Sequence, residues 1–179
     1  VEMAFLQTDQ VIRRGLHPFR RFLSEYFHGD TGSAERFEQT WNRLAEPVGN
    51  RSLADELRRT RPFLEDLAGI PPKDSLPASL DAKARFENTI FAVNAFFRAL
   101  SLASPLIIVM EDFHWLDSDS ARLTEFLTRN PEGFPYMVIA SCRTGDDGSV
   151  GDLIADSELV TGNIVLGPLS PEAELGLMN

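Results

Sequence analysis

Apolar side chains in the first hundred residues recur at three- and four-residue intervals, the spacing that lines one face of an α-helix. The longest such pattern begins after Asp81, a suitable N-cap, and continues for about 20 residues through Phe86, Ile90, Val93 and Phe97. Shorter patterns predict helices over about 17–27, 34–44, 53–59 and 62–68, while residues 1–6 match a short strand only weakly. The N-terminal half is therefore predicted to be helix-rich, with a helical region spanning 17–102.

The pattern changes after Pro105. Leu106–Met110 and Tyr136–Ser141 are continuous apolar runs, typical of strands that are covered on both faces. A helix over about 118–128, capped by Asp117 or Ser118, separates them. Strand, helix and strand at this spacing predict a right-handed parallel crossover, and hence an α/β fold with a parallel sheet flanked by helices.

The remainder, 144–179, is predicted to form a loop, a last strand and the beginning of a further region. Residues 144–151 are rich in Gly and Asp, residues 163–166 fit a short strand, and a helix is expected from Pro171.

Charge and composition exclude several classes of function. The net charge of −10 argues against direct nucleic-acid binding, which depends on neutralising phosphates with Lys and Arg. A single cysteine, Cys142, excludes an internal disulfide framework and a cysteine zinc site. No apolar run approaches the length of a membrane span, and no signal peptide is recognisable, so we expect a cytoplasmic location and no membrane contact.

The candidate chemistry lies where the first apolar run ends. Glu111 and Asp112 follow Met110 directly, and ligands of open α/β sheets bind at the carboxyl ends of strands. Two carboxylates at a dry strand end need a counter-charge, and Mg²⁺ accepts one or two carboxylates while keeping its waters and phosphate oxygens. Arg143 follows the second run, so it should lie at the same end of the sheet, where a cation stabilises charge on a phosphate. A simpler interpretation is that the two acids cap the next loop and helix.

The stretch PLIIVMEDFHWLD, residues 105–117, carries a resemblance to a known family. With Cys142-Arg143 and the GPLSPE segment at 167–172, it resembles the STAND proteins, signal-transducing P-loop ATPases, and especially their bacterial predicted-ATPase branch related to the AAA class. The resemblance covers most of 60–179. It implies an incomplete P-loop NTPase core over 1–143, with a Walker B strand at 106–110 and a sensor strand at 136–141, and a lid that begins within 144–179.

The resemblance also implies roles for individual residues. Glu111 and Asp112 would form the Walker B pair that holds magnesium, with Asp112 as the acid that activates water. Arg143 would be the sensor of the γ-phosphate. We expect Trp115 to pack, Asp117 to cap and His114 to have a structural role before a catalytic one.

One element of the family is missing. A phosphate-binding loop reads G-x-x-x-x-G-K-[ST], and neither lysine of the chain, Lys73 or Lys83, has these neighbours. The loop would lie upstream of Val1 in a longer parent. We therefore expect Mg²⁺ and ATP to bind to the intact parent, and this chain alone to bind ATP weakly or not at all and to hydrolyse none.

The resemblance implies that the partners are the rest of the parent: the P-loop segment, an effector domain and C-terminal helical repeats. An open edge of the sensor strand would also favour self-association, unless 163–166 closes it. Two alternatives stay open: a degenerate, noncatalytic interaction domain on the same scaffold, and an unrelated α/β or receiver-like domain that holds magnesium at Glu111 and Asp112.

Overall fold

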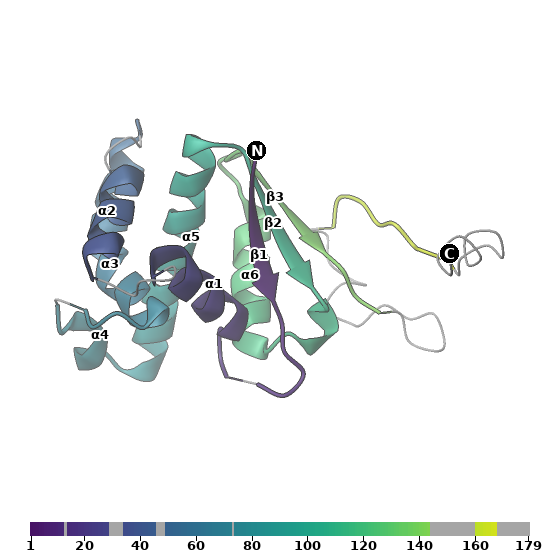
Figure 1. Cartoon of the computed structure of the whole chain (residues 1–179), viewed down its shortest axis with the longest axis horizontal. Helices are drawn as coiled ribbons and strands as arrows, with labels where there is room; N and C mark the ends of the chain where they lie inside the picture. The colour runs from purple at the N-terminus through teal and green to yellow at the C-terminus, as the bar shows by residue number, and fades with distance from the viewer. Residues whose placement is uncertain (13, 29–33, 46–48, 73, 144–159, 168–179) are drawn as a thin grey trace.

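A three-stranded parallel sheet forms the centre of the molecule, in the order β1-β2-β3 (Figure 1). In this computed structural model, the strands are β1 (Glu2–Gln7), β2 (Leu106–Glu111) and β3 (Tyr136–Ala140). The structure describes residues 1–12, 14–28, 34–45, 49–72, 74–143 and 160–167. The predicted α/β class with a parallel sheet and flanking helices is confirmed, and the weak N-terminal signal is a full strand that pairs with β2 along its whole length.

The described chain also contains six α-helices and a 3-10 turn. They are α1 (His17–His28), α2 (Ala34–Ala45), α3 (Arg51–Ala68), α4 (Leu76–Ser79), α5 (Ala82–Ala103), η1 (Phe113–Trp115) and α6 (Ser118–Arg129). The two predicted helices around Pro62 are one continuous helix, α3. Proline removes one backbone hydrogen bond, but the helix continues because Leu57, Phe63 and Leu64 bury its inner face. No helix in the described part is long and apolar enough to cross a membrane.

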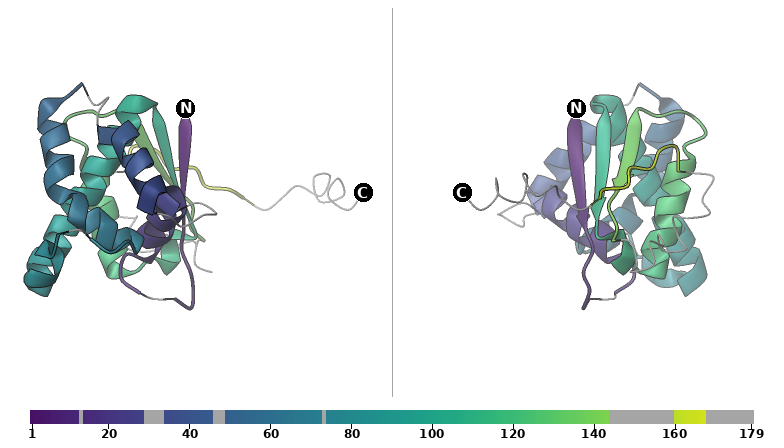
Figure 2. Two further views of the ribbon diagram at one scale, coloured as in Figure 1. Left: turned by 60° about the vertical axis from the view of Figure 1, so that its left-hand side comes forward. Right: turned by 90° about the vertical axis from the view of Figure 1, so that its right-hand side faces the viewer.

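The described helices cover one face of the sheet, as Figure 2 shows from two sides. The covered face carries Ala4 and Leu6 of β1 with Leu106, Ile108 and Met110 of β2, all nearly inaccessible to solvent. Phenylalanines of the helices complete this core, among them Phe19, Phe27, Phe96 and Phe97, whose rings contact one another edge to face or tilted. Burial of this apolar surface is the main stabilising contribution that the sequence supplies.

The opposite face of the sheet is apolar and uncovered by any described residue. Met3 and Phe5 of β1 stand in register with Ile107 and Val109 of β2, and these in turn with Met137 and Ile139 of β3. We call these six residues the open sheet face. Its outer members are half exposed, from 45% for Ile139 to 52% for Met3 and Met137. The prediction that β2 and β3 are covered on both faces is thus wrong for the part of the chain that the structure describes.

The predicted last strand at 163–166 is also wrong. Residues 160–167 have no regular secondary structure, and Ile164, Val165 and Leu166 are exposed. The apolar run is short and lies between Gly162 and Gly167, and a strand forms only where a neighbour accepts its backbone hydrogen bonds. The predicted loop at 144–151 and helix from Pro171 lie outside the described residues.

One arginine holds α2 against α3. The Arg61 guanidinium binds Glu38 at 2.6 Å and Glu65 at 2.8 Å, and it lies over the rings of Phe37 and Trp41 at 5.1 and 5.0 Å. Burial by itself would lower the pKa of Arg61, but hydrogen bonds to the two carboxylates raise it overall. The contact therefore fixes a charged group within an otherwise aromatic interface.

Candidate functional site

Glu111 and Asp112 lie at the carboxyl end of the middle strand. Glu111 is the last residue of β2 and stands in register with Gln7 of β1. Asp112 has a left-handed backbone, with φ 50° and ψ 46°, which turns the chain out of the strand and into η1. Few non-glycine residues adopt this conformation, and Asp is among those that tolerate it. Both side chains are exposed at the end of the sheet.

Neighbouring strands hold the backbone beneath the two acids. The Thr8 hydroxyl lies 2.9 Å from the main-chain oxygens of both Glu111 and Asp112. On the other side, the Phe113 amide donates to the Ser141 carbonyl at 2.8 Å, and the Ser141 amide donates to the Met110 carbonyl at 2.9 Å. The strand ends are thus joined by hydrogen bonds, and the acid pair has a defined position between them.

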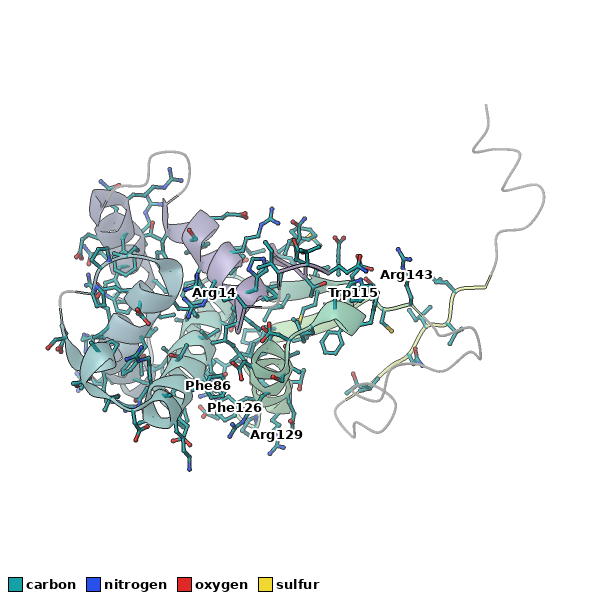
Figure 3. The ribbon with its side chains drawn as sticks, turned by 90° about the horizontal axis from the view of Figure 1, so that it is seen from below. Arg14, Phe86, Trp115, Phe126, Arg129 and Arg143 are labelled. Atoms are coloured by element: carbon teal, nitrogen blue, oxygen red, sulfur yellow. The ribbon has the colours of Figure 1, made fainter. Side chains whose placement is uncertain are left out.

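Arg143 lies at this same end of the sheet, because it follows β3, which is parallel to β2 and bonded to it through Ser141. Its side chain is exposed, and no ion pair joins it to Glu111 or Asp112 in the described chain. Figure 3 shows Arg143 beyond Trp115, on the side away from Arg14 and Phe86. Glu111, Asp112 and Arg143 thus all lie at the carboxyl end of the sheet. Their roles in metal binding and catalysis stay predictions.

The exposure of Glu111 and Asp112 removes one reason for expecting a bound cation. The sequence suggested a dry strand end, where two ionised carboxylates need compensation, but water reaches both groups. Among the described residues, no three His, Cys, Asp or Glu side chains come together as metal ligands. Two adjacent carboxylates still match the donor chemistry of Mg²⁺, which takes one or two protein carboxylates and completes its shell with water and phosphate oxygens.

The His114 side chain has an unexplained buried nitrogen. Its Nδ1 atom is inaccessible to solvent and has no hydrogen-bond partner among the described residues. The imidazole lies against Trp115, with ring centroids 4.7 Å apart and planes inclined at 48°. A buried polar atom without a partner is unusual in native proteins, and nothing in the sequence indicated this one.

Asp117 caps α6, which confirms one of the two predicted caps. Its Oδ1 accepts from the Ser120 amide at 2.9 Å, and its Oδ2 accepts from the Ser120 hydroxyl at 2.6 Å. The same Oδ1 also accepts from the Leu16 amide at 3.1 Å, which the sequence did not indicate. Asp117 therefore connects the loop after β1 to the loop after β2.

Sequence reasoning missed a hollow of about 390 Å³ on the helical side of the sheet, separate from the acid pair. Arg14, Arg20 and Arg85 contribute to its lining, with Asp66, Phe86 and Asp119. These residues come from four separate parts of the chain, so no local motif could have identified the group.

Comparisons with protein-family models, with curated proteins and with solved structures found no match to this chain.

Proposed function

We propose that this chain is part of an ATP-binding and ATP-hydrolysing NTPase of signal transduction or transcription regulation, to which it contributes the Walker B and sensor residues. The observation that carries the proposal is the acid pair: Glu111 and Asp112 are consecutive and exposed at the carboxyl end of the middle strand of a parallel sheet. Ligands of such sheets bind at the carboxyl ends of the strands.

In this proposal, Glu111 and Asp112 would hold Mg²⁺, which neutralises phosphate charge when it is bound. Asp112 would also orient an attacking water and accept its proton, and water already reaches its carboxylate. Thr8 would keep the backbone of both acids in place through its hydroxyl. Arg143 is exposed and unpaired with either acid, so its guanidinium is free to turn toward a terminal phosphate.

The chain on its own is proposed to be inactive, because it contains no phosphate-binding loop. Backbone amides and a lysine would have to come from another segment of a parent protein. The outer edge of β3 is unpaired among the described residues, and it offers one place at which such a segment could join the sheet.

A paramagnetic probe tests the acid pair on this chain directly. Mn²⁺ replaces Mg²⁺ at oxygen ligands and broadens the NMR signals of nearby amides. We expect Mn²⁺ at low concentration to broaden the amides of Gln7, Phe113 and Ser141 first, and the Glu111→Gln/Asp112→Asn double variant to lose this selectivity. The matched control is Glu125→Gln/Asp55→Asn, which removes two exposed acids elsewhere. Equal broadening in wild type and the Glu111/Asp112 variant would count against the proposal.

Hydrolysis is tested on a longer parent that contains a phosphate loop. Asp112→Asn should lower the rate of Mg²⁺-dependent ATP hydrolysis by at least about a hundredfold, the usual scale for a general base. Glu111→Gln should also lower this rate, because it removes a proposed Mg²⁺ ligand. The free energy of unfolding should change by less than about 1 kcal/mol, since both side chains are exposed. Loss of folding with activity would instead support a capping role.

One observation favours a second candidate, a noncatalytic interaction domain. The open sheet face presents six apolar side chains in register, and exposed apolar patches commonly mark contact with another protein. A parent without any G-x-x-x-x-G-K-[ST] segment, together with Mn²⁺ broadening that is not selective for the acid pair, would favour this candidate.

A further inference from the structure

The hollow on the helical side of the sheet is lined at the beginnings of three helices. Leu16 immediately precedes α1, Ala82 begins α5, and Asp119 lies in the first turn of α6. Helix N-termini carry partial positive charge, so the backbone adds to the potential of the side chains. Figure 3 shows Arg14 and Phe86 on this side of the molecule, away from Arg143.

Three arginines line the hollow, and none of them forms an ion pair within the described chain. Arg14 and Arg85 are exposed, while Arg20 is partly buried and donates through Nε to the Gly15 carbonyl at 3.2 Å. Burial lowers the pKa of Arg20, and the charge of Arg14 lowers it further, with Asp66 acting in the opposite direction. The Arg14 and Arg20 guanidinium groups therefore repel each other, and Asp66 offsets this repulsion only in part.

The lining as a whole has a cationic excess. Three guanidinium groups face two carboxylates, Asp66 and Asp119, which leaves a net charge of +1 on a protein whose total is −10. A local excess of the opposite sign on a strongly acidic chain has no evident solubility role. It lowers the free energy of an anion placed between the guanidinium groups, whose fork of N–H donors matches phosphate oxygens.

An apolar wall completes the hollow. Phe86 and Leu16 both line it. The hollow has a volume of about 390 Å³, within the range that small organic ligands occupy. The Phe86 ring is partly buried and also lies 5.4 Å from the Arg122 guanidinium, which helps to fix its position. A ligand that fits has an anionic end and a compact apolar or ring-shaped body.

We propose that this hollow, which we call the arginine pocket, is a binding site for a small phosphate monoester. Its phosphate lies between Arg14, Arg20 and Arg85, and its apolar part packs on Phe86. A dianionic phosphate matches three guanidinium groups better than a monoanionic carboxylate does. This site is separate from the acid pair, and the inference does not depend on the proposed ATPase function.

Calorimetric titration of the whole chain with phenyl phosphate, at constant ionic strength, tests the proposal. We expect saturable binding with one site, weaker binding of inorganic phosphate, which has no ring, and still weaker binding of benzoate. Arg14→Gln and Arg85→Gln should each weaken phenyl phosphate binding by at least about tenfold, the scale of one charge-assisted hydrogen bond. Both side chains are exposed, so these variants should fold, which circular dichroism checks.

Arg58→Gln is the matched control, because Arg58 is an exposed arginine on α3 that does not line the pocket. The affinity of this variant for phenyl phosphate should stay within about twofold of wild type, as expected for a distant surface charge screened by salt. Absence of saturable binding, or equal weakening in all three variants, would overturn the assignment. Benzoate binding as tight as phenyl phosphate binding would overturn the choice of phosphate.

Discussion

Asp112 combines a carboxylate at the carboxyl end of β2 with a left-handed backbone. The two properties can be tested separately. Glycine adopts φ 50° without strain, whereas alanine does not. We therefore expect Asp112→Gly to be more stable to unfolding than Asp112→Ala by about 1 kcal/mol. Urea denaturation of both variants measures the difference. Equal stability would mean that this backbone conformation carries no strain.

Tyr26 provides a prediction about alkaline pH. Its ring packs on Phe27 and Phe96, each with a centroid separation of 5.3 Å, and this burial raises the pKa of Tyr26 from its ordinary value of 10.0 to about 12. Between these two values the unfolded chain loses the proton first. The free energy of unfolding should therefore be unaffected below pH 10.0 and fall by about 2 kcal/mol as pH rises to about 12.

Replacement by phenylalanine isolates this effect. In Tyr26→Phe, the free energy of unfolding should decrease much less above pH 10.0 than in wild type, because the ionisable group is gone. Tyr136→Phe leaves Tyr26 as the only tyrosine, so its absorbance titration reports one group. A midpoint near the ordinary tyrosine value in that variant would contradict the prediction.

Residues whose role depends on neighbours in sequence were predictable, and the others were not. The acid pair and the Asp117 cap follow from a strand, a turn and a helix that are consecutive along the chain. The arginine pocket does not, because Arg14, Arg20 and Arg85 meet only when α1 and α5 pack together. The exposure of Glu111 and Asp112 was also unpredictable, since it depends on what covers the strand end.

At the scale of the elements, α3 offers two arginines in contrasting surroundings. Arg61 binds Glu65, whose side chain is 3% exposed, whereas Arg58 binds Asp55 at the surface. Arg61→Met should lower the free energy of unfolding by about 3 kcal/mol, because it removes a guanidinium that binds Glu38 and the buried Glu65 and lies over two aromatic rings. Arg58→Met should cost less than about 1 kcal/mol, as is usual for an exposed pair. Thermal and urea denaturation measure both, and similar losses would contradict the ranking.

Element boundaries were predicted well where a cap marks them. Asp81 is the N-cap of α5 and Asp117 is the N-cap of α6, and both side chains accept a hydrogen bond from the backbone three residues later. The prediction of two separate helices around Pro62 was wrong. Burial of the surrounding apolar face outweighs the local helix-breaking tendency of proline. The supposed strand at 163–166 failed for the opposite reason: strand propensity alone supplies no pairing partner.

At the scale of the whole molecule, the open sheet face predicts concentration-dependent self-association of this chain. Met137 and Ile139 are exposed on β3, one of the two strands whose outer edges are unpaired among the described residues. Sedimentation velocity should show dimers or larger species that increase with concentration, and Met137→Lys/Ile139→Lys should shift the protein to monomer.

The matched control for that shift is Val11→Lys/Leu102→Lys. It adds the same charge at two exposed apolar residues outside the sheet and should leave association unchanged. If both double variants abolish association, net charge and not the open sheet face is responsible.

The parallel sheet was predictable because apolar runs joined by a helix have few possible topologies. Which face the helices cover could not be predicted, because β2 and β3 are apolar on both sides.

The two tryptophans give the molecule optical reporters at different places. Trp41 is buried between α2 and α3, whereas Trp115 is half buried beside His114 at the carboxyl end of the sheet. In Trp41→Phe, the emission would come from Trp115 alone. Its wavelength would respond to ligands at the acid pair and stay constant when the arginine pocket fills, so one spectrum could distinguish occupancy of the two sites.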